Sequence, residues 1–589
     1  MRLAAVFTFL FLLATAFRTG WNTPQTDFPN YYTAAKLARE GQPLRSYYDW
    51  TWFARQMNYA GNGMQLGAYT PQTPLTMLPI VGLAGLPPQR AKQVWLILNL
   101  FFLAAIAWLL SRVTRFSFAT IWVLAFCGYF SIRTNFLYGQ YYIFLLLLLT
   151  LTYFFLHRRN LLSSGLLAGI AFALKLYGGP FLLFFVARRH WRAVLGMTLA
   201  GVLLLGVAIQ LFGWADIRFY ATQILPRSLE GGSVDPYNPG LPTFSTLLRR
   251  TFVAEAELNP HPFFHAPWLF FCLRTIFSLS IILVLFLGMN KQQSSERHDF
   301  AWFLIAVVLL STSTGSYTFI VLLLPLVLLL EESGQGKSCL LIVSYVLLTL
   351  PLHPVWLFPK VWLLLGLFFF VGYRNLSSIL RQPALVGFAV LMLISFLDAK
   401  RHLRSYVQEP AQKFGHVSVQ AGALFSSFPV ASRAGIFYQS MDRDRYVLRW
   451  LHDSQNTKLG FSGHALHPRL AGDGESIYFE LVADGVSKMM QFKPSSLSAT
   501  PLAIAVPGDS TMPAVSPDGA WLAFEGEKDG FSQISVRDLL HGTLIPLTSG
   551  NCNNSSPSWE LDSKSILFAS DCGRAFGLPA LYRAPLPIK

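Results

Sequence analysis

The sequence is short of charge: Asp, Glu, Lys and Arg make up 13% of its 589 residues, whereas soluble globular proteins carry roughly 25%. Cysteine is also scarce, with five residues and no CxxC pair or Cys/His spacing typical of a metal site. These shortages exclude a soluble enzyme, a disordered chain and a disulfide-rich secreted module. Hydrophobic residues make up 53% of the chain and occur in runs such as 142–156 and 319–330, which indicates an integral membrane protein.

The formal net charge of +16 does not indicate nucleic-acid binding, because the chain has no basic stripe with interleaved aromatic residues. The arginines gather instead in short loops between apolar runs, as the positive-inside rule describes for cytoplasmic loops. On this basis we predict that the polar loops 21–74 and 214–266 and the polar tail face outward. Lys400, Arg401 and Arg404 follow the last span on that outer side, and a miscounted hairpin would place the tail inside.

A change of composition at Asp398 divides the chain into a membrane domain, 1–398, and a soluble domain, 399–589. We predict an α-helical polytopic membrane domain of about 11–13 spans. The candidate spans are the apolar stretches 3–20, 91–111, 116–132, 141–156, 162–175, 177–187, 193–213, 267–289, 300–311, 316–330, 337–351, 361–373 and 383–397. Residues 75–87 are predicted to be re-entrant or interfacial, and the first stretch would also fit a cleaved signal peptide.

The soluble domain contains a repeat. Three segments share a proline, an Asp-Gly-like turn and an alternating apolar strand, and the matching prolines are 45 and 44 residues apart. The turn aspartates are Asp473, Asp518 and Asp562. This pattern resembles TolB-type β-propeller repeats, so we predict an all-β propeller-like domain with repeats near 429–450, 468–497, 513–540 and 557–585. Cys552 and Cys572 flank the last repeated strand and are a disulfide candidate in an oxidising compartment.

Two charged residues lie near the outer ends of predicted helices, where polar groups are costly and often functional. Asp27 lies in the first outer loop, where a carboxylate can act as general base on a sugar hydroxyl or as the N-cap of a helix over 30–40. Lys175 ends the stretch 162–175, where its amino group can snorkel to the interface or bind a lipid phosphate. From the residues alone, both pairs of alternatives stay open.

Short motifs follow one another between residues 27 and 326. They are Asp-x3-Tyr-Tyr-x-Ala-Ala-x5-Gly (27–41), Tyr-x-Pro-x-x-Pro (69–74), Gly-Gln (139–140), Gly165 and Gly169 before Ala-Leu-Lys-Leu-Tyr (173–177), Arg-Arg-x-Trp-Arg (188–192) and LLSTSTGSYTFIVLLLPL (309–326). This succession resembles glycosyltransferase family 87, the polyprenyl-phosphate-mannose-dependent membrane glycosyltransferases of the GT-C fold. The resemblance covers approximately residues 1–340 and does not extend to the propeller.

The resemblance implies transfer of a mannose-like hexose from a polyprenyl-phosphate donor to an envelope glycan or glycolipid acceptor on the outer face, with inversion at the anomeric carbon. It implies that Asp27 is the general base and that Lys175 lies beside the lipid phosphate, without a nucleotide or other cofactor. The remaining candidate substrate-binding residues are Tyr31, Tyr32, Tyr69, Gln140, Tyr177, Asn238, Arg249 and Tyr317. No metal ligands are identified, and the need for a metal stays open.

Two other functions fit the same composition. A transporter of polyprenyl lipids or polysaccharides would show two matching repeats with broken helices, and the sequence shows none. A non-catalytic membrane-anchored receptor would act through the propeller alone. We expect a multi-pass protein of a bacterial-type inner membrane whose propeller binds a glycan or a protein outside. The family often has Tyr-x-Tyr-Pro-Pro where this chain has 69–74. Its late turn often has Ser-Pro followed by an aromatic residue and a His, whereas this chain has Ser311-Thr312-Ser313 with Tyr317 and no His, so the sugar and the acceptor stay open.

Overall fold

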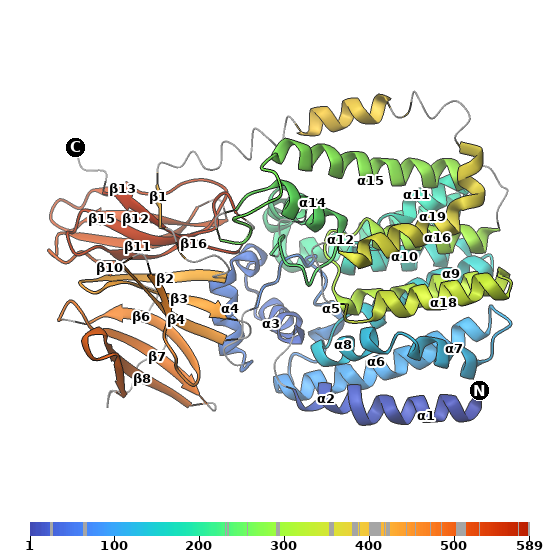
Figure 1. Ribbon diagram of the computed structural model, residues 1–589, viewed down its shortest axis with the longest axis horizontal. Helices are drawn as coiled ribbons and strands as arrows, with labels where there is room; N and C mark the ends of the chain where they lie inside the picture. Colours follow the sequence, from blue (N-terminus) through green and yellow to red (C-terminus); the bar gives the residue numbers. More distant parts are fainter. Residues whose placement is uncertain are drawn as a thin grey trace.

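The computed structural model describes the chain except for a set of short segments. These are residues 24–26, 63–66, 230, 232–234, 256, 290–294, 353–357, 380–386, 388, 400–413, 418, 420–423, 443–444, 454, 472, 484–485, 502–513, 529, 575–576 and 587–589. Helices continue up to Ala399, and strands follow from Gly415 to Pro585. Figure 1 shows the two parts next to each other along the longest axis, with the helices on the right and the sheets on the left.

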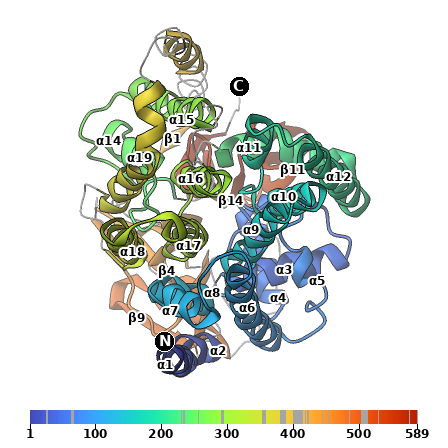
Figure 2. The same cartoon turned by 90° about the vertical axis from the view of Figure 1, so that its right-hand side faces the viewer.

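The helical part is a bundle. Its α-helices are α1 (Arg2–Leu12), α2 (Arg18–Asn22), α3 (Phe28–Arg39), α4 (Trp50–Tyr59), α5 (Leu78–Val81), α6 (Pro88–Ser111), α7 (Phe118–Phe126), α8 (Tyr129–Tyr138), α9 (Tyr142–His157), α10 (Leu161–Lys175), α11 (Phe181–Ala187), α12 (Trp191–Phe219), α13 (Leu225–Leu229), α14 (Phe244–Phe252), α15 (Pro267–Met289), α16 (Glu296–Leu309), α17 (Leu323–Glu332), α18 (Gln335–Thr349) and α19 (Pro359–Ile379). In Figure 2, which looks along the bundle, α16 and α17 lie inside and α1 and α12 at its edge. The burial of nearly every residue of α16 and α17 agrees with this arrangement.

Most helices fall on the predicted apolar stretches, whereas α3, α4, α13 and α14 lie in the polar loops 21–74 and 214–266, and many helices are short. Four are long and apolar enough to cross a membrane, namely Arg2–Asn22, Pro88–Ser111, Trp191–Leu229 and Pro267–Met289. The pair α8 and α9, bent by 120°, would make a fifth. A crossing needs about 20 residues, whereas α11 has 7 and α9 has 16. The described residues therefore give four or five membrane-length helices, fewer than the 11–13 crossings expected, and the stretch 383–397 lies partly outside them.

Glycines let α10 and α12 approach each other closely. A Cβ atom on Gly165 would lie 1.9 Å from the carbonyl oxygen of Ala193, and one on Gly196 would lie 2.3 Å from that of Leu162. Small residues at helix interfaces allow such close backbone packing in membrane proteins. Gly165, which belongs to one of the sequence motifs, thus has a packing role in the bundle.

The strands form four antiparallel sheets of four strands, which confirms the predicted propeller-like domain. The first three are β2 (Leu424–Ser432), β3 (Gly435–Asp442), β4 (Arg445–His452) and β5 (Gln455–Lys458); β6 (His464–Leu470), β7 (Ile477–Ala483), β8 (Val486–Lys493) and β9 (Ser498–Pro501); and β10 (Ala514–Val515), β11 (Trp521–Lys528), β12 (Phe531–Asp538) and β13 (Leu544–Pro546). The last contains β14 (Asn554–Trp559), β15 (Ser565–Ser570), β16 (Ala580–Pro585) and β1 (Gly415–His416). Each predicted repeat lies in one sheet, and the pairing of β1 with β16 closes the last sheet with the first strand.

The repeated aspartates shape the turn in three of the sheets. Asp473 Oδ1 accepts hydrogen bonds from the amides of Glu475 and Ser476, and Asp518 and Asp562 each accept one from the amide two residues later. Such Asx turns stabilise a tight reversal, and the next residue has positive φ, which favours glycine. The next residue is glycine in two turns and Ser563, with φ 59°, in the third. The 45-residue repeat is therefore a repeat of turn geometry.

The propeller packs against both long loops of the bundle. Trp50 from loop 21–74 packs on Phe425 with ring centroids 6.3 Å apart, and Phe219 at the end of α12 packs on Phe531 at 5.4 Å. Arg574 of the last sheet forms an ion pair with Glu257 in loop 214–266 at 2.7 Å. The two loops and the propeller therefore share one end of the bundle, which excludes a tail on the side opposite these loops.

Candidate active site

A cavity of about 920 Å³ lies at the end of the bundle that faces the propeller. Its wall is formed by the start of α3, the loop after α4, the α8–α9 and α10–α11 junctions, segments 226–229, 238–245 and 307–317, and α15. A hollow of this size can enclose most of a small ligand. The predicted site residues that line it are Asp27, Tyr31, Gln140, Lys175, Tyr177, Asn238 and Tyr317.

Asp27 stands at the N-cap position of α3, but its side chain makes no capping hydrogen bond. Pro29 in the first turn of α3 has no N–H that would need a cap. The carboxylate instead accepts a hydrogen bond of 2.5 Å from Nε2 of Gln140. The side chain thus lies at the cavity wall and does not fold back onto its own helix.

Gln140 is oriented by a second hydrogen bond. The hydroxyl of Tyr31 donates to Oε1 of Gln140 at 2.8 Å, and both side chains are buried. Because the amide oxygen is occupied in this way, the amide NH2 faces Asp27. Gly139, at the end of α8, has φ 62°, and a Cβ atom there would lie 2.7 Å from Cβ of Phe28. The Gly-Gln motif therefore brings the amide next to the carboxylate through a turn that glycine accommodates.

The surroundings of Asp27 change its acidity. Burial raises the pKa of the Asp27 carboxyl above its usual value, and the Gln140 hydrogen bond and the charges of Lys175 and Lys92 oppose this rise. A carboxylate removed from water is a stronger base than an exposed one, because desolvation disfavours its charged form. The site therefore holds a basic carboxylate beside two lysines.

Lys175 ends α10 and is half-buried. Its Nζ atom lies 4.9 Å from the ring centroid of Tyr142 and 5.8 Å from that of Tyr31. Cation–π contacts of this kind hold an ammonium group over the ring faces. The amino group is thus directed into the cavity near Asp27, and an anion in the cavity can reach it.

Tyrosines form one wall of the cavity. The rings of Tyr142 and Tyr317 stack with centroids 5.2 Å apart, and Tyr177 meets Tyr142 edge-on at 5.9 Å. The Tyr177 hydroxyl donates to Oγ of Ser311 at 3.0 Å. Tyrosine rings combine apolar faces with polar edges, which matches the apolar faces and hydroxyl groups of a sugar.

The part of the cavity formed by α15 has a different chemistry. Arg274 Nη2 lies 3.9 Å from Oδ2 of Asp398, and the hydroxyl of Thr275 donates to the same oxygen at 2.6 Å. Asn238 contributes from loop 214–266, and its Oδ1 accepts a hydrogen bond from the amide of Gly240. Of these residues, only Asn238 was predicted from the sequence, whereas Arg274, Thr275 and Asp398 were not.

Three of the predicted substrate-binding residues do not line the cavity. The hydroxyl of Tyr32 donates to the carbonyl of Leu86, and that of Tyr69 donates to the carbonyl of Thr73. The guanidinium of Arg249 lies 4.6 Å from the ring centroid of Phe270. Adjacent residues on a helix point in directions about 100° apart, and here Tyr31 faces the cavity whereas Tyr32 points away from it.

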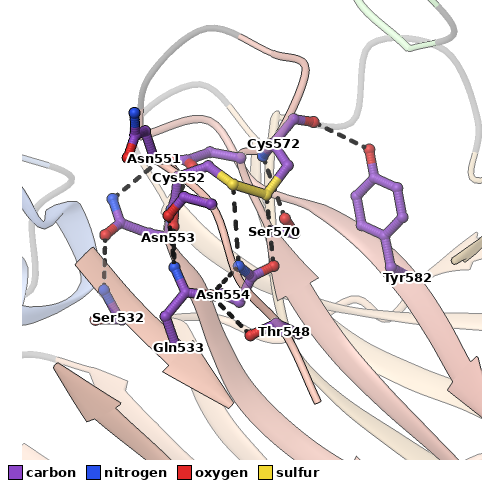
Figure 3. Close-up of a disulfide and its surroundings, with 12 residues drawn as sticks. Ser532, Gln533, Thr548, Asn551, Cys552, Asn553, Asn554, Ser570, Cys572 and Tyr582 are labelled. Carbon is purple, nitrogen blue, oxygen red and sulfur yellow. Dashed lines mark hydrogen bonds between the residues drawn. A yellow bond between two sulfur atoms is a disulfide. The ribbon is translucent and has the colours of Figure 1, made fainter. Parts of the chain in front are cut away.

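The disulfide of the propeller lies beside the loops that contact the bundle. Cys552 and Cys572 are bonded, and Figure 3 shows the surrounding hydrogen bonds, including those that Gln533 donates to the carbonyl of Cys552 and that Asn554 donates to Gln533. Asn551 next to Cys552 accepts a hydrogen bond from Arg227 of the bundle, and Arg574 follows Cys572 by two residues. The disulfide therefore joins two segments that contact the bundle.

No group of three or more His, Cys, Asp and Glu side chains arranged to hold a metal ion occurs among the described residues.

Residues 68–314 match the model of Glycosyltransferase family 87. The match indicates a membrane glycosyltransferase, and it includes Gln140 and Lys175 but begins after Asp27. The chain has no match among curated proteins.

Solved structures similar to this chain include two TolB proteins. TolB from Acinetobacter baumannii is 20% identical over 29% of this chain and 46% of its own, with a TM-score of 0.15. A TolB structure from Agrobacterium tumefaciens is 23% identical over 28% of this chain and 60% of its own, also with a TM-score of 0.15. This chain thus covers less than two thirds of either TolB chain.

Proposed function

We propose that the protein is an inverting glycosyltransferase that moves a mannose-like hexose from polyprenyl phosphate to a glycan or glycolipid acceptor of the cell envelope. One observation carries the proposal. Asp27, whose carboxylate is not used as a helix cap, and Lys175 line the same cavity. That cavity lies in a bundle whose central part matches glycosyltransferase family 87.

The proposed reaction needs one base and one anion-binding group. Asp27 removes the proton from an acceptor hydroxyl while the hydroxyl oxygen attacks C1 of the donor sugar. The bond from C1 to the phosphate oxygen breaks on the opposite face, the electron pair stays on the phosphate, and C1 is inverted. Lys175 stabilises the charge of the departing phosphate. The donor brings its own leaving group, so this scheme uses no nucleotide or cofactor.

The part of the cavity formed by α15 supports a lipid-linked donor. Phe277 and Leu279 of α15 and Ile394 give it an apolar wall. α15 is itself long and apolar enough to cross a membrane. A polyprenyl chain needs such a surface, since burying its apolar carbons away from water is favourable.

We place the cavity, both long loops and the propeller on the outer face of a bacterial-type inner membrane. Arginine-rich turns lie in the loops after α9 and α11, and such loops mark the cytoplasmic side. The Cys552–Cys572 disulfide agrees with an oxidising compartment for the propeller. On that face the propeller would bind an acceptor glycan or a partner protein.

The test uses the purified full chain in lipid nanodiscs. It is incubated with polyprenyl-phosphate mannose carrying radiolabelled mannose and with glycolipids extracted from a bacterial envelope. We expect label in a glycolipid product whose new linkage has the anomeric configuration opposite to that of the donor. Retained configuration would contradict the mechanism. Movement of the labelled donor across vesicle membranes without transfer would favour a transporter.

A further inference from the structure

Lys92 is a buried lysine for which the proposed reaction has no role. It lies in the second turn of α6, only 1% of its surface is exposed, and it does not line the cavity. A lysine buried at the end of a membrane-length helix is costly and needs hydrogen-bond acceptors. The partners of its amino group therefore indicate what it does.

The Lys92 amino group joins the ends of two other helices. Its Nζ atom donates to the carbonyl of Thr23 at 2.7 Å and to that of Leu137 at 2.9 Å. Thr23 is the residue that ends α2, and Leu137 lies in the last turn of α8. The last carbonyls of a helix have no partner within it, and a cation at this end also interacts favourably with the helix dipole.

Neighbouring residues on the same face of α6 make the same kind of contact. Gln89 Nε2 donates to the carbonyl of Trp21 at 2.6 Å, and Trp95 Nε1 donates to that of Gly139 at 3.1 Å. Positions three apart lie on one face of a helix. Gln89, Lys92 and Trp95 therefore form a row of donors, which we call the α6 donor row, that binds the ends of α2 and α8.

The two joined segments carry the base and its amide partner. Asp27 comes four residues after Thr23, Gln140 comes three residues after Leu137, and these two side chains hydrogen-bond to each other. We propose that Lys92 is a positioning residue that holds the Asp27 segment against the Gln140 segment and so aligns the general base. This inference rests on the proposed function of Asp27.

Lys92 also acts on Asp27 through its charge. The groups that face Asp27 are Lys92 from α6, Lys175 from α10, Tyr31 from α3, Tyr138 from α8 and Tyr317 from the turn after α16. The two lysines stabilise the carboxylate, so loss of Lys92 should make Asp27 harder to deprotonate. The acid limb of the pH–rate profile should then move to higher pH.

The bundle has other contacts that keep α2 and α8 together without Lys92. A Cβ atom on Gly20 of α2 would lie 2.4 Å from the carbonyl oxygen of Phe136 in α8, so the two backbones are in direct contact. The rings of Phe17 and Phe136 also pack at 5.8 Å. A substitution at Lys92 should therefore change the alignment of the two following segments more than the helix packing.

The experiment measures the pH dependence of kcat for mannose transfer, and KM for the donor, in the full chain. The central variant is Lys92→Met, which keeps the length of the side chain and removes its charge and its donors. Gln89→Leu removes one neutral donor of the α6 donor row at a half-buried position. Gln93→Met, on the same helix but outside the row, is the matched control, and Asp27→Asn is measured in parallel.

For Lys92→Met we expect kcat to fall by about 10- to 100-fold, since a displacement near 1 Å can cost about that much. KM for the donor should change little, and the acid limb should move to higher pH. Gln89→Leu should lower kcat less, without moving the acid limb, and Gln93→Met should match the unsubstituted protein. If Lys92→Met does not fold, Gln89→Leu serves as the test. An unchanged kcat in Gln89→Leu then overturns the proposal.

The inference is also overturned if folded Lys92→Met keeps both kcat and the acid limb while Asp27→Asn is inactive. That result would leave the proposed function standing. Transfer by Asp27→Asn at the full rate would instead refute the role of Asp27 itself, and with it both proposals.

Discussion

Arg574 of the propeller and Glu257 of the bundle form a buried ion pair at the contact between the two parts. A substitution of Arg574 alone breaks this pair. Arg574 is 5% exposed and bonds to Glu257, which is fully buried, at 2.7 Å and to Glu255 at 3.2 Å. Arg574→Met leaves the Glu257 carboxylate buried without its main partner, which typically costs about 3–5 kcal/mol. That free energy is a factor of more than about 100 in the equilibrium between docked and undocked propeller.

Hydrogen–deuterium exchange of the full chain in nanodiscs measures this effect. The amides of Glu255 and Asn259 are each hydrogen-bonded to the carbonyl of the other residue, so they report on loop 214–266. In Arg574→Met we expect these amides to exchange about 100-fold faster, and the double variant Glu257→Gln/Arg574→Met should recover most of the protection. Unchanged exchange in Arg574→Met, or a double variant worse than the single one, would refute this account of the interface.

Three further predictions concern other parts of the molecule. Burial raises the pKa of Asp27, and the base acts only when it is deprotonated. On acidification, kcat/KM should therefore be lost at a pH above about 4, the usual pKa of aspartate. A loss that begins only at or below about pH 4 would contradict this. Cys552→Ser/Cys572→Ser opens a bridge across 20 residues, so chemical denaturation should show a propeller less stable by about 3 kcal/mol. Gly165→Ala places a methyl group against the carbonyl of α12, and the SDS-induced unfolding of the bundle should show a loss of about 1–3 kcal/mol, whereas an unchanged midpoint would disprove the close packing.

The fold class could be predicted because its signals are local. Apolar stretches mark the helices, and the spacing of Asp473, Asp518 and Asp562 marks the repeated turns of the sheets. The number of crossings could not be predicted, since a short apolar stretch such as α11 crosses a membrane only where neighbouring segments continue it, and their arrangement appears only in the folded chain. The closure of the last sheet by β1 was missed because a strand of two residues has no recognisable pattern.

The site was predictable only where a motif placed it. Asp27, Gln140 and Lys175 come from three separate segments of the chain. In the sequence only the family resemblance connects them, and the structure shows that they line one cavity. Tyr32 and Tyr69 were included because they belong to the same motifs, although their hydroxyls bond to backbone carbonyls. A sequence motif does not tell which of its side chains faces the cavity.

Lys92 was overlooked although its signal was present. The predicted span 91–111 begins one residue before it, and a charged residue inside a span is costly enough to require an explanation. Its partners are backbone carbonyls of Thr23 and Leu137, which no pattern of side chains reveals. Contacts to distant backbone atoms appear only in the folded chain.

The most direct test of the account compares kcat for mannose transfer by the unsubstituted protein, by Asp27→Asn and by Glu40→Gln. Asp27→Asn keeps the shape of the side chain and removes the base, whereas Glu40→Gln neutralises an exposed carboxylate at the other end of α3. General-base catalysis typically contributes about 10²–10⁴-fold, so Asp27→Asn should lose at least about 100-fold in kcat while Glu40→Gln transfers normally. Equal transfer by Asp27→Asn and the unsubstituted protein would contradict the account.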